Sequence, residues 1–209
     1  DKVRATQATE FFERFKQSEE PAQWAVASAP ADQNILVNAG PGAGKTFVLV
    51  GRIAHLIREH GVDPSQIVVL AFNRAVVFEI RRRIRDLFKS LGYASYVGRL
   101  RVFTFHSFAL RSLARESVDV AGVEMSNVVD VFAKRLANDP AFAVRVAAGA
   151  RCILVDEFQD MNDGVYSIIR SVYEGTDRKA GVMVIGDDDQ DILRWNRKEN
   201  GASNFSEKY

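Results

Sequence analysis

The chain has 209 residues, which suits one large domain or two small ones, and its 47% hydrophobic and 26% charged residues are the balance of an ordinary globular protein. The formal net charge is +1, so the total charge does not indicate a particular partner. The single cysteine, Cys152, excludes a disulfide within the chain, and no apolar run approaches the roughly 18–20 residues that cross a membrane. We therefore expect no membrane association and a reducing, cytoplasmic compartment.

Two kinds of apolar pattern alternate along the chain. Short runs of apolar residues without polar alternation predict strands that are buried on both faces. The expected strands cover residues 34–38, 66–72, 101–105, 152–158 and 181–187. The expected helices, which have helical periodicity, cover residues 8–18, 22–28, 46–60, 74–92, 107–117 and 163–175, and residues 117–150 are Ala-rich and expected to be helical. This alternation predicts an α/β fold with a parallel sheet and helices on both faces.

The residues with the most distinctive chemistry follow the expected strands directly. Ligands of parallel α/β sheets bind at the carboxyl ends of the strands, so these positions predict a site at one edge of the sheet. The five strand ends read Asn38-Ala39-Gly40, Phe72-Asn73, Phe105-His106, Asp156-Glu157 and Gly186-Asp187.

The segment AGPGAGKT, residues 39–46, joins an expected strand to an expected helix. A Gly-rich backbone can curl around a phosphate, and the helix N-terminus adds a partial positive charge. Lys45 would reach the β- and γ-phosphates of a nucleotide, and Thr46 would ligate Mg²⁺. The remaining expected phosphate contacts are Ala39, Gly40, Gly42, Ala43 and Gly44. The strict pattern has Gly at the first of these positions, so the loop is a variant, and the alternative is a plain Gly-rich turn.

The segment CILVDEFQD, residues 152–160, places two acids at the end of an apolar strand. Asp156 would hold Mg²⁺ through water, because this ion keeps much of its hydration shell. Glu157 would orient and deprotonate the attacking water in phosphoryl transfer. The alternative is a strand-end turn that is merely rich in acids.

Charge is unevenly distributed between the middle and the end of the chain. Residues 74–115 hold ten Lys/Arg against two acids, whereas residues 151–191 hold ten Asp/Glu against four Lys/Arg. Such a chain could hold a polyanion on one surface and a metal–nucleotide complex at another. Two solvated helix faces of opposite sign explain the same pattern, including the arginine run at residues 81–85.

Five motifs in order resemble those of UvrD/Rep-type superfamily-one DNA helicases. They are AGPGAGKT, VLAFNRAVVFEIRRRI, VFTFHSFALR, ILVDEFQD and VIGDDDQDILRW. The resemblance covers about residues 35–195 and implies a RecA-like P-loop NTPase fold, the first of two motor domains in that family. It divides the chain into a motor domain of residues 1–107 and 151–209 and a short helical insertion of residues 108–150, a reduced accessory subdomain.

The resemblance implies an ATP-dependent DNA helicase or translocase that moves 3′-to-5′ on single-stranded DNA or a 3′-tailed duplex. ATP and Mg²⁺ would be its cofactors, and a role in DNA repair and an association with the bacterial nucleoid would follow. The second motor domain is absent from this chain, which we read as a monomeric N-terminal fragment that binds nucleotide and hydrolyses it poorly. The alternatives are a P-loop kinase or GTPase and a nucleotide-gated DNA-binding regulatory module without unwinding activity.

The resemblance also implies roles for individual residues. Gln23 would read adenine, and Gln190, within VIGDDDQDILRW, would sense the γ-phosphate as a neutral amide. Asp187 and its two acidic neighbours then form a capped or salt-bridged turn rather than a metal cage, because crowded acids repel one another. The expected DNA contacts are Phe72, Asn73, Arg74, Thr104, His106, Trp195 and Arg197.

Two of these expected DNA contacts have ordinary structural alternatives. Phe72 would stack on a base of a single strand, since every base offers a π-face, or it could be a core aromatic residue that closes a strand. His106 could be a structural histidine. It has no Cys or second His at metal-ligand spacing, so zinc is rejected.

Overall fold

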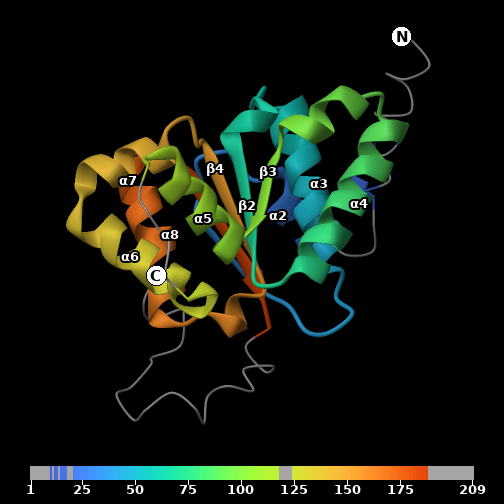
Figure 1. The fold of residues 1–209 in the computed structure, drawn as a ribbon. Helices are drawn as coiled ribbons and strands as arrows, with labels where there is room; N and C mark the ends of the chain where they lie inside the picture. The colour runs from blue at the N-terminus through green and yellow to red at the C-terminus, as the bar shows by residue number, and fades with distance from the viewer. Residues whose placement is uncertain (1–9, 11, 14, 18–20, 118–123, 188–209) are drawn as a thin grey trace.

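The computed structural model describes residues 10, 12–13, 15–17, 21–117 and 124–187. Within them, five parallel strands form one sheet in the order β1-β5-β4-β2-β3 (Figure 1). The strands are β1 Ile35–Asn38, β2 Ile67–Ala71, β3 Arg101–Thr104, β4 Cys152–Asp156 and β5 Gly181–Gly186. All five lie within the predicted ranges, and the predicted α/β fold with a parallel sheet is confirmed.

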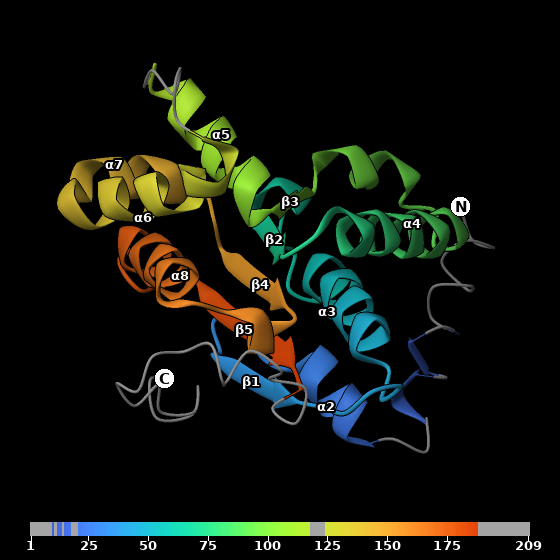
Figure 2. The same cartoon turned by 60° about the horizontal axis from the view of Figure 1, so that its bottom comes forward.

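Helices cover both faces of this sheet (Figure 2). On one face lie α2 Pro21–Ser28, α3 Lys45–Arg58 and α4 Arg74–Ser90. On the other face lie α5 Phe105–Arg115, α6 Val128–Asn138, α7 Pro140–Ala147 and α8 Asp163–Gly175. Four short 3₁₀ turns join them in the described part of the chain: η1 Pro64–Gln66, η2 Ala94–Arg99, η3 Met125–Asn127 and η4 Phe158–Asp160.

Each face of the sheet contributes to its own hydrophobic core. Along β2, Val68 and Leu70 belong to the core beneath α5 to α8, whereas Val69 and Ala71 belong to the core beneath α2 to α4. Every residue of β2 is buried, as are all residues of β4 and β5. Burial on both faces explains why these strands read as unbroken apolar runs in the sequence.

Three phenylalanines that we predicted to end strands, Phe72, Phe105 and Phe158, lie outside them. Phe105 begins α5, because Thr104, the last residue of β3, forms a capping box with Ser107 and starts the helix. Phe158 lies in η4, because Glu157 adopts left-handed backbone with φ 58° and ends the extended run of β4. Turn geometry therefore sets the positions of the polar residues at the ends of β3 and β4.

The helices α6 and α7 pack against α8 and share its core with the sheet. The fit between α7 and α8 is close, because a Cβ added at Gly175 would lie 2.5 Å from the carbonyl oxygen of Ala143. The expected division between residues 107 and 108 falls inside α5, and it stays a prediction. In the described ranges, no helix has both the length and the apolar character needed to cross a membrane.

Candidate active site

The loop between β1 and α3 has the backbone that phosphate binding requires. Gly42 and Gly44 have φ of 76° and 80°, a left-handed conformation that residues with a Cβ rarely adopt. The loop is fixed at its start, where the amide of Ala39 donates to the carbonyl oxygen of Gly186 at 2.8 Å. Gly44 caps α3 without a side-chain hydrogen bond, and no acid lies in the first helical turn. The first N–H groups of α3 are therefore placed to donate hydrogen bonds to an anion.

Lys45 links this loop to the end of β4. Its Nζ donates to the carbonyl oxygen of Ala39 at 3.3 Å and lies 4.0 Å from Oε2 of Glu157, and its side chain is only 12% exposed. Thr46 follows it as the second residue of α3 and is half-buried. One cation thus stands between the phosphate loop and the acids of the neighbouring strand.

The two acids at the end of β4 have different environments. Asp156 is 2% exposed, and burial, followed by the charge of Glu157, raises the pKa of its carboxyl from 3.8 to about 6. Its Oδ1 accepts a hydrogen bond from the amide of Glu157 at 3.0 Å. Among the described residues, no three His, Cys, Asp or Glu side chains group as a metal cage. A single buried carboxylate still fits Mg²⁺, which needs one or two protein ligands when phosphates and water complete its shell.

The raised pKa of Asp156 predicts a pH-dependent stability without Mg²⁺ and nucleotide. The folded state holds this proton more tightly than the unfolded state, so the contribution is full below pH 3.8 and is lost as the pH rises through about 6. Asp156→Asn should therefore raise the free energy of unfolding at pH 7.5 by about 3 kcal/mol, and the gain should vanish near pH 4. Urea unfolding at pH 7.5, 6 and 4 measures this, with the exposed-site variant Asp32→Asn as control. A gain that does not change with pH would contradict the prediction.

Gln159, to which the sequence analysis gave no role, joins the ends of two strands. Its Nε2 donates to Oε2 of Glu157 at 2.6 Å, and its Oε1 accepts from the amide of Asp187 at 3.0 Å. It is 7% exposed. Gly186 has no space for a side chain here, since an added Cβ would contact Oε1 of Gln159 and the amide of Phe158. The signal was a polar residue two positions after Glu157, but which residue it meets at the end of β5 depends on strand register.

Gln23 lies beside the phosphate loop, and its role as the adenine contact stays a prediction. Its Nε2 donates to the carbonyl oxygen of Ala43 at 3.1 Å. The helix α2 that carries it is held by Arg52 of α3, a residue that the sequence analysis also missed. The guanidinium of Arg52 is 2% exposed and donates to the carbonyl oxygens of Ala27, Ala29 and Pro30 at the end of α2. This buried contact fixes α2 against the helix that follows the phosphate loop.

The expected DNA contacts that the structure describes gather at the ends of β2 and β3. Phe72 is half-buried against the core, with its ring centroid 5.1 Å from that of Phe105. Asn73 caps α4 by accepting from the amide of Val76 at 2.8 Å. Thr104 is buried in its capping box.

Of the remaining expected site residues, two DNA contacts are exposed to solvent, and the others, including the expected γ-phosphate sensor, lie in the undescribed part of the chain. Arg74 and His106 are exposed. Gln190, Trp195 and Arg197 lie outside the described residues, so their roles stay predictions.

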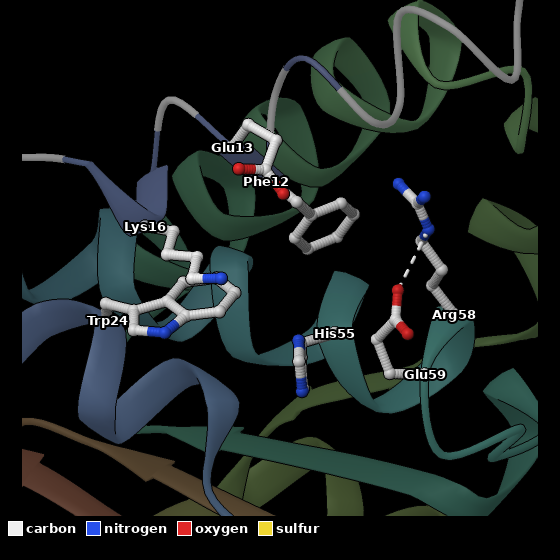
Figure 3. Close-up of a pocket in the computed structure, with 7 residues that line it drawn as sticks. All are labelled: Phe12, Glu13, Lys16, Trp24, His55, Arg58 and Glu59. Atoms are coloured by element: carbon white, nitrogen blue, oxygen red, sulfur yellow. Dashed lines mark ion pairs between the residues drawn. The ribbon is translucent and has the colours of Figure 1, made fainter.

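A cavity of about 390 Å³ lies elsewhere, beside the C-terminal half of α3. Figure 3 shows His55 standing between Trp24 and the ion pair of Arg58 with Glu59, whose Nε and Oε1 atoms are 3.0 Å apart. Phe12 also lines it. None of the residues at the strand ends lines this cavity, so it is separate from the candidate active site.

A parallel sheet, a Gly-rich loop before α3 and acids at the end of β4 define a P-loop nucleotide-binding domain. The model of the UvrD/REP helicase N-terminal domain matches residues 19–131 and 123–208, and the chain belongs to this family. The expected likeness to the first, RecA-like motor domain of UvrD/Rep-type helicases is confirmed. Membership of this family excludes the kinase and GTPase alternatives.

Several ATP-dependent DNA helicases are similar to the chain. SRS2 of Saccharomyces cerevisiae is 36% identical over 93 residues, which cover 44% of this chain and 8% of that protein. PcrA of Leuconostoc citreum is 34% identical over 101 residues, covering 48% of this chain and 13% of PcrA. PcrA of Staphylococcus epidermidis is 29% identical over 163 residues, which cover 69% of this chain and 22% of that protein. The chain thus spans less than a quarter of the length of each of these relatives.

Proposed function

We propose that the chain is the ATP-binding motor domain of a DNA helicase or translocase that moves 3′-to-5′ on single-stranded DNA. The observation that carries this proposal is the position of Lys45. Its Nζ lies between the phosphate loop and Glu157, 3.3 Å from the loop carbonyl of Ala39 and 4.0 Å from Oε2 of Glu157. A nucleotide γ-phosphate would take the place of Glu157 as the partner of Lys45, which would leave the carboxylate beside the phosphoryl group to activate water.

The roles around the nucleotide follow from these positions. The backbone of residues 39–44 and the start of α3 would bind the phosphates, and Lys45 would neutralise their charge. Thr46 and Asp156 would hold Mg²⁺, which supplies charge neutralisation of the transferred phosphoryl group. Glu157 would accept a proton from the attacking water. Gln23 would contact adenine, and Gln190 would sense the γ-phosphate.

The DNA strand would cross the ends of β2 and β3. Phe72 would stack on a base, and Asn73, Arg74, Thr104 and His106 would contact the strand. Trp195 and Arg197, beyond the described residues, would extend this path. A second motor domain would supply the arginines that complete hydrolysis, and the two domains moving together would act in DNA repair at the nucleoid.

ATPase assays test this proposal. The 209-residue chain should bind ATP-Mg²⁺ and turn it over slowly, because charge-neutralising arginines lie in the second motor domain. The full-length protein should show turnover stimulated more by single-stranded DNA than by duplex or RNA, and it should unwind 3′-tailed but not 5′-tailed duplex. Stimulation by DNA without unwinding would favour translocation, and binding of both ligands without turnover would favour the regulatory module. Strong DNA-stimulated turnover by the 209-residue chain alone would contradict the proposal that a second motor domain supplies the arginines for hydrolysis.

A further inference from the structure

The outer face of α4 carries one continuous stripe of basic and aromatic residues. Its members are spaced three or four positions apart, which places them on the same side of a helix. All are exposed, and the opposite face of α4 is the one that enters the core. We call this set the α4 stripe, and it consists of Arg74, Phe78, Arg82, Arg85 and Lys89.

Phe78 is the unusual member of the α4 stripe. It is 67% exposed, the largest exposed fraction among the solvent-facing large hydrophobic side chains of the described residues. Its helix neighbours Val77 and Ile80 are buried in the core. An aromatic ring held in solvent between cations is a common way to bind an unpaired base, whose face is free for stacking.

The charge around Phe78 is positive and is only partly neutralised within the helix, where Arg82 pairs with both acids, Glu79 and, at 3.7 Å, Asp86. Residues 74–90 hold six Lys/Arg and two acids. One of the acids, Glu79, lies at the side of the α4 stripe and is bound by Arg82 and Arg83, with N–O distances of 2.6 to 2.9 Å. These bonds lower the pKa of the Glu79 carboxyl to about 2. Among the described residues, no carboxylate forms an ion pair with the remaining basic members, Arg74, Arg85 and Lys89.

We propose that the α4 stripe binds a single-stranded nucleic acid, with phosphates on Arg74, Arg85 and Lys89 and one base stacked on Phe78. The stripe starts at Arg74, next to Phe72, and α4 rises about 25 Å away from the strand ends at 1.5 Å per residue. Figures 1 and 2 show α4 at the outer end of its helical layer, beside α3. This inference rests on the proposed function and extends the path of the strand beyond the edge of the sheet.

Anisotropy titrations of fluorescein-labelled oligo(dT) with the full-length protein test the stripe. Phe78→Ala should weaken binding about 5-fold or more, the range for loss of one stacked base. The double variant Arg85→Gln/Lys89→Gln should flatten the dependence of log affinity on log salt concentration by about 1.4, because each lost phosphate contact on a single strand contributes about 0.7. Arg83→Gln, on another side of the same helix, is the matched control and should leave affinity within about 2-fold of wild type.

The outcomes separate this inference from the proposed function. ATP turnover without DNA should be unchanged in all three variants, and their exposed positions allow folding, which thermal unfolding checks. Equal oligo(dT) affinity and equal salt dependence in wild type, Phe78→Ala and the double variant would overturn the proposal that the α4 stripe binds a single strand. DNA-stimulated turnover would still support the proposed function in that case. A loss that affects duplex binding but not oligo(dT) binding would also overturn it, because Phe78 could then not be stacking on an unpaired base.

Discussion

Lys45→Ala should lower ATP turnover of the full-length protein by at least about 100-fold, the effect of removing one preorganised charge-stabilising group. The side chain is 12% exposed and lies at the N-terminus of α3, so no other described cation replaces it between Ala39 and Glu157. Affinity for ATP-Mg²⁺ should fall as well, because in the proposed site Lys45 would bind phosphate in the ground state and the transition state alike. Steady-state turnover and titration with a fluorescent ATP analogue measure the two effects.

Unfolding should not explain this loss. The Nζ of Lys45 lies 4.0 Å from Oε2 of Glu157, and a partly solvated pair at that distance contributes at most about 1 kcal/mol to stability. Lys179→Ala is the matched control, because Lys179 is exposed and pairs with Asp177 in the turn between α8 and β5. Wild-type turnover in Lys45→Ala would reject the assignment of residues 39–46 as the phosphate loop.

Glu157→Gln should separate binding of nucleotide from its hydrolysis. The amide keeps the size of the side chain and can still accept the hydrogen bond of Gln159, but it cannot take a proton from water. Turnover should fall about 100-fold to 10,000-fold, the usual contribution of a general base. Affinity for ATP-Mg²⁺ should be kept or increased, because one negative charge near the γ-phosphate is removed.

Single-turnover hydrolysis and nucleotide titration of the same preparation check this second expectation. Glu174→Gln is its control, at an exposed acid on α8 that pairs with Arg170. A variant that lost nucleotide affinity while keeping its rate of hydrolysis would show that Glu157 binds rather than activates. Rapid hydrolysis with normal affinity would place the base elsewhere.

The sheet and the phosphate loop could be predicted because their sequence signals are local. Unbroken apolar runs follow from burial on both faces, and Gly42 and Gly44 follow from backbone that a Cβ would strain. The turn geometry after the strands was less predictable. Phe105 and Phe158 are as apolar as the strands before them, and only the cap at Thr104 and the left-handed φ of Glu157 end those strands.

The contacts between distant segments could not be predicted from one sequence. Gln159 meets Asp187 because β4 and β5 pair with Asp156 opposite Ile185, a register that no local pattern reveals. Arg52 resembles any arginine of an amphipathic helix until the end of α2 is seen to lie against it. The packing of α6 and α7 on α8 is likewise invisible in an Ala-rich segment.

The two hydrogen bonds of Gln159 have a consequence for timing in the proposed motor. One end of a single amide holds Glu157, and the other end holds the backbone of Asp187, the first residue after β5. A displacement of that backbone would strain the bond to Oε1 or turn the amide, and a turned amide would change the orientation of Glu157. Tension on the chain after β5 would thereby change the rate of hydrolysis, and the time that each nucleotide stays bound would depend on the orientation of Glu157.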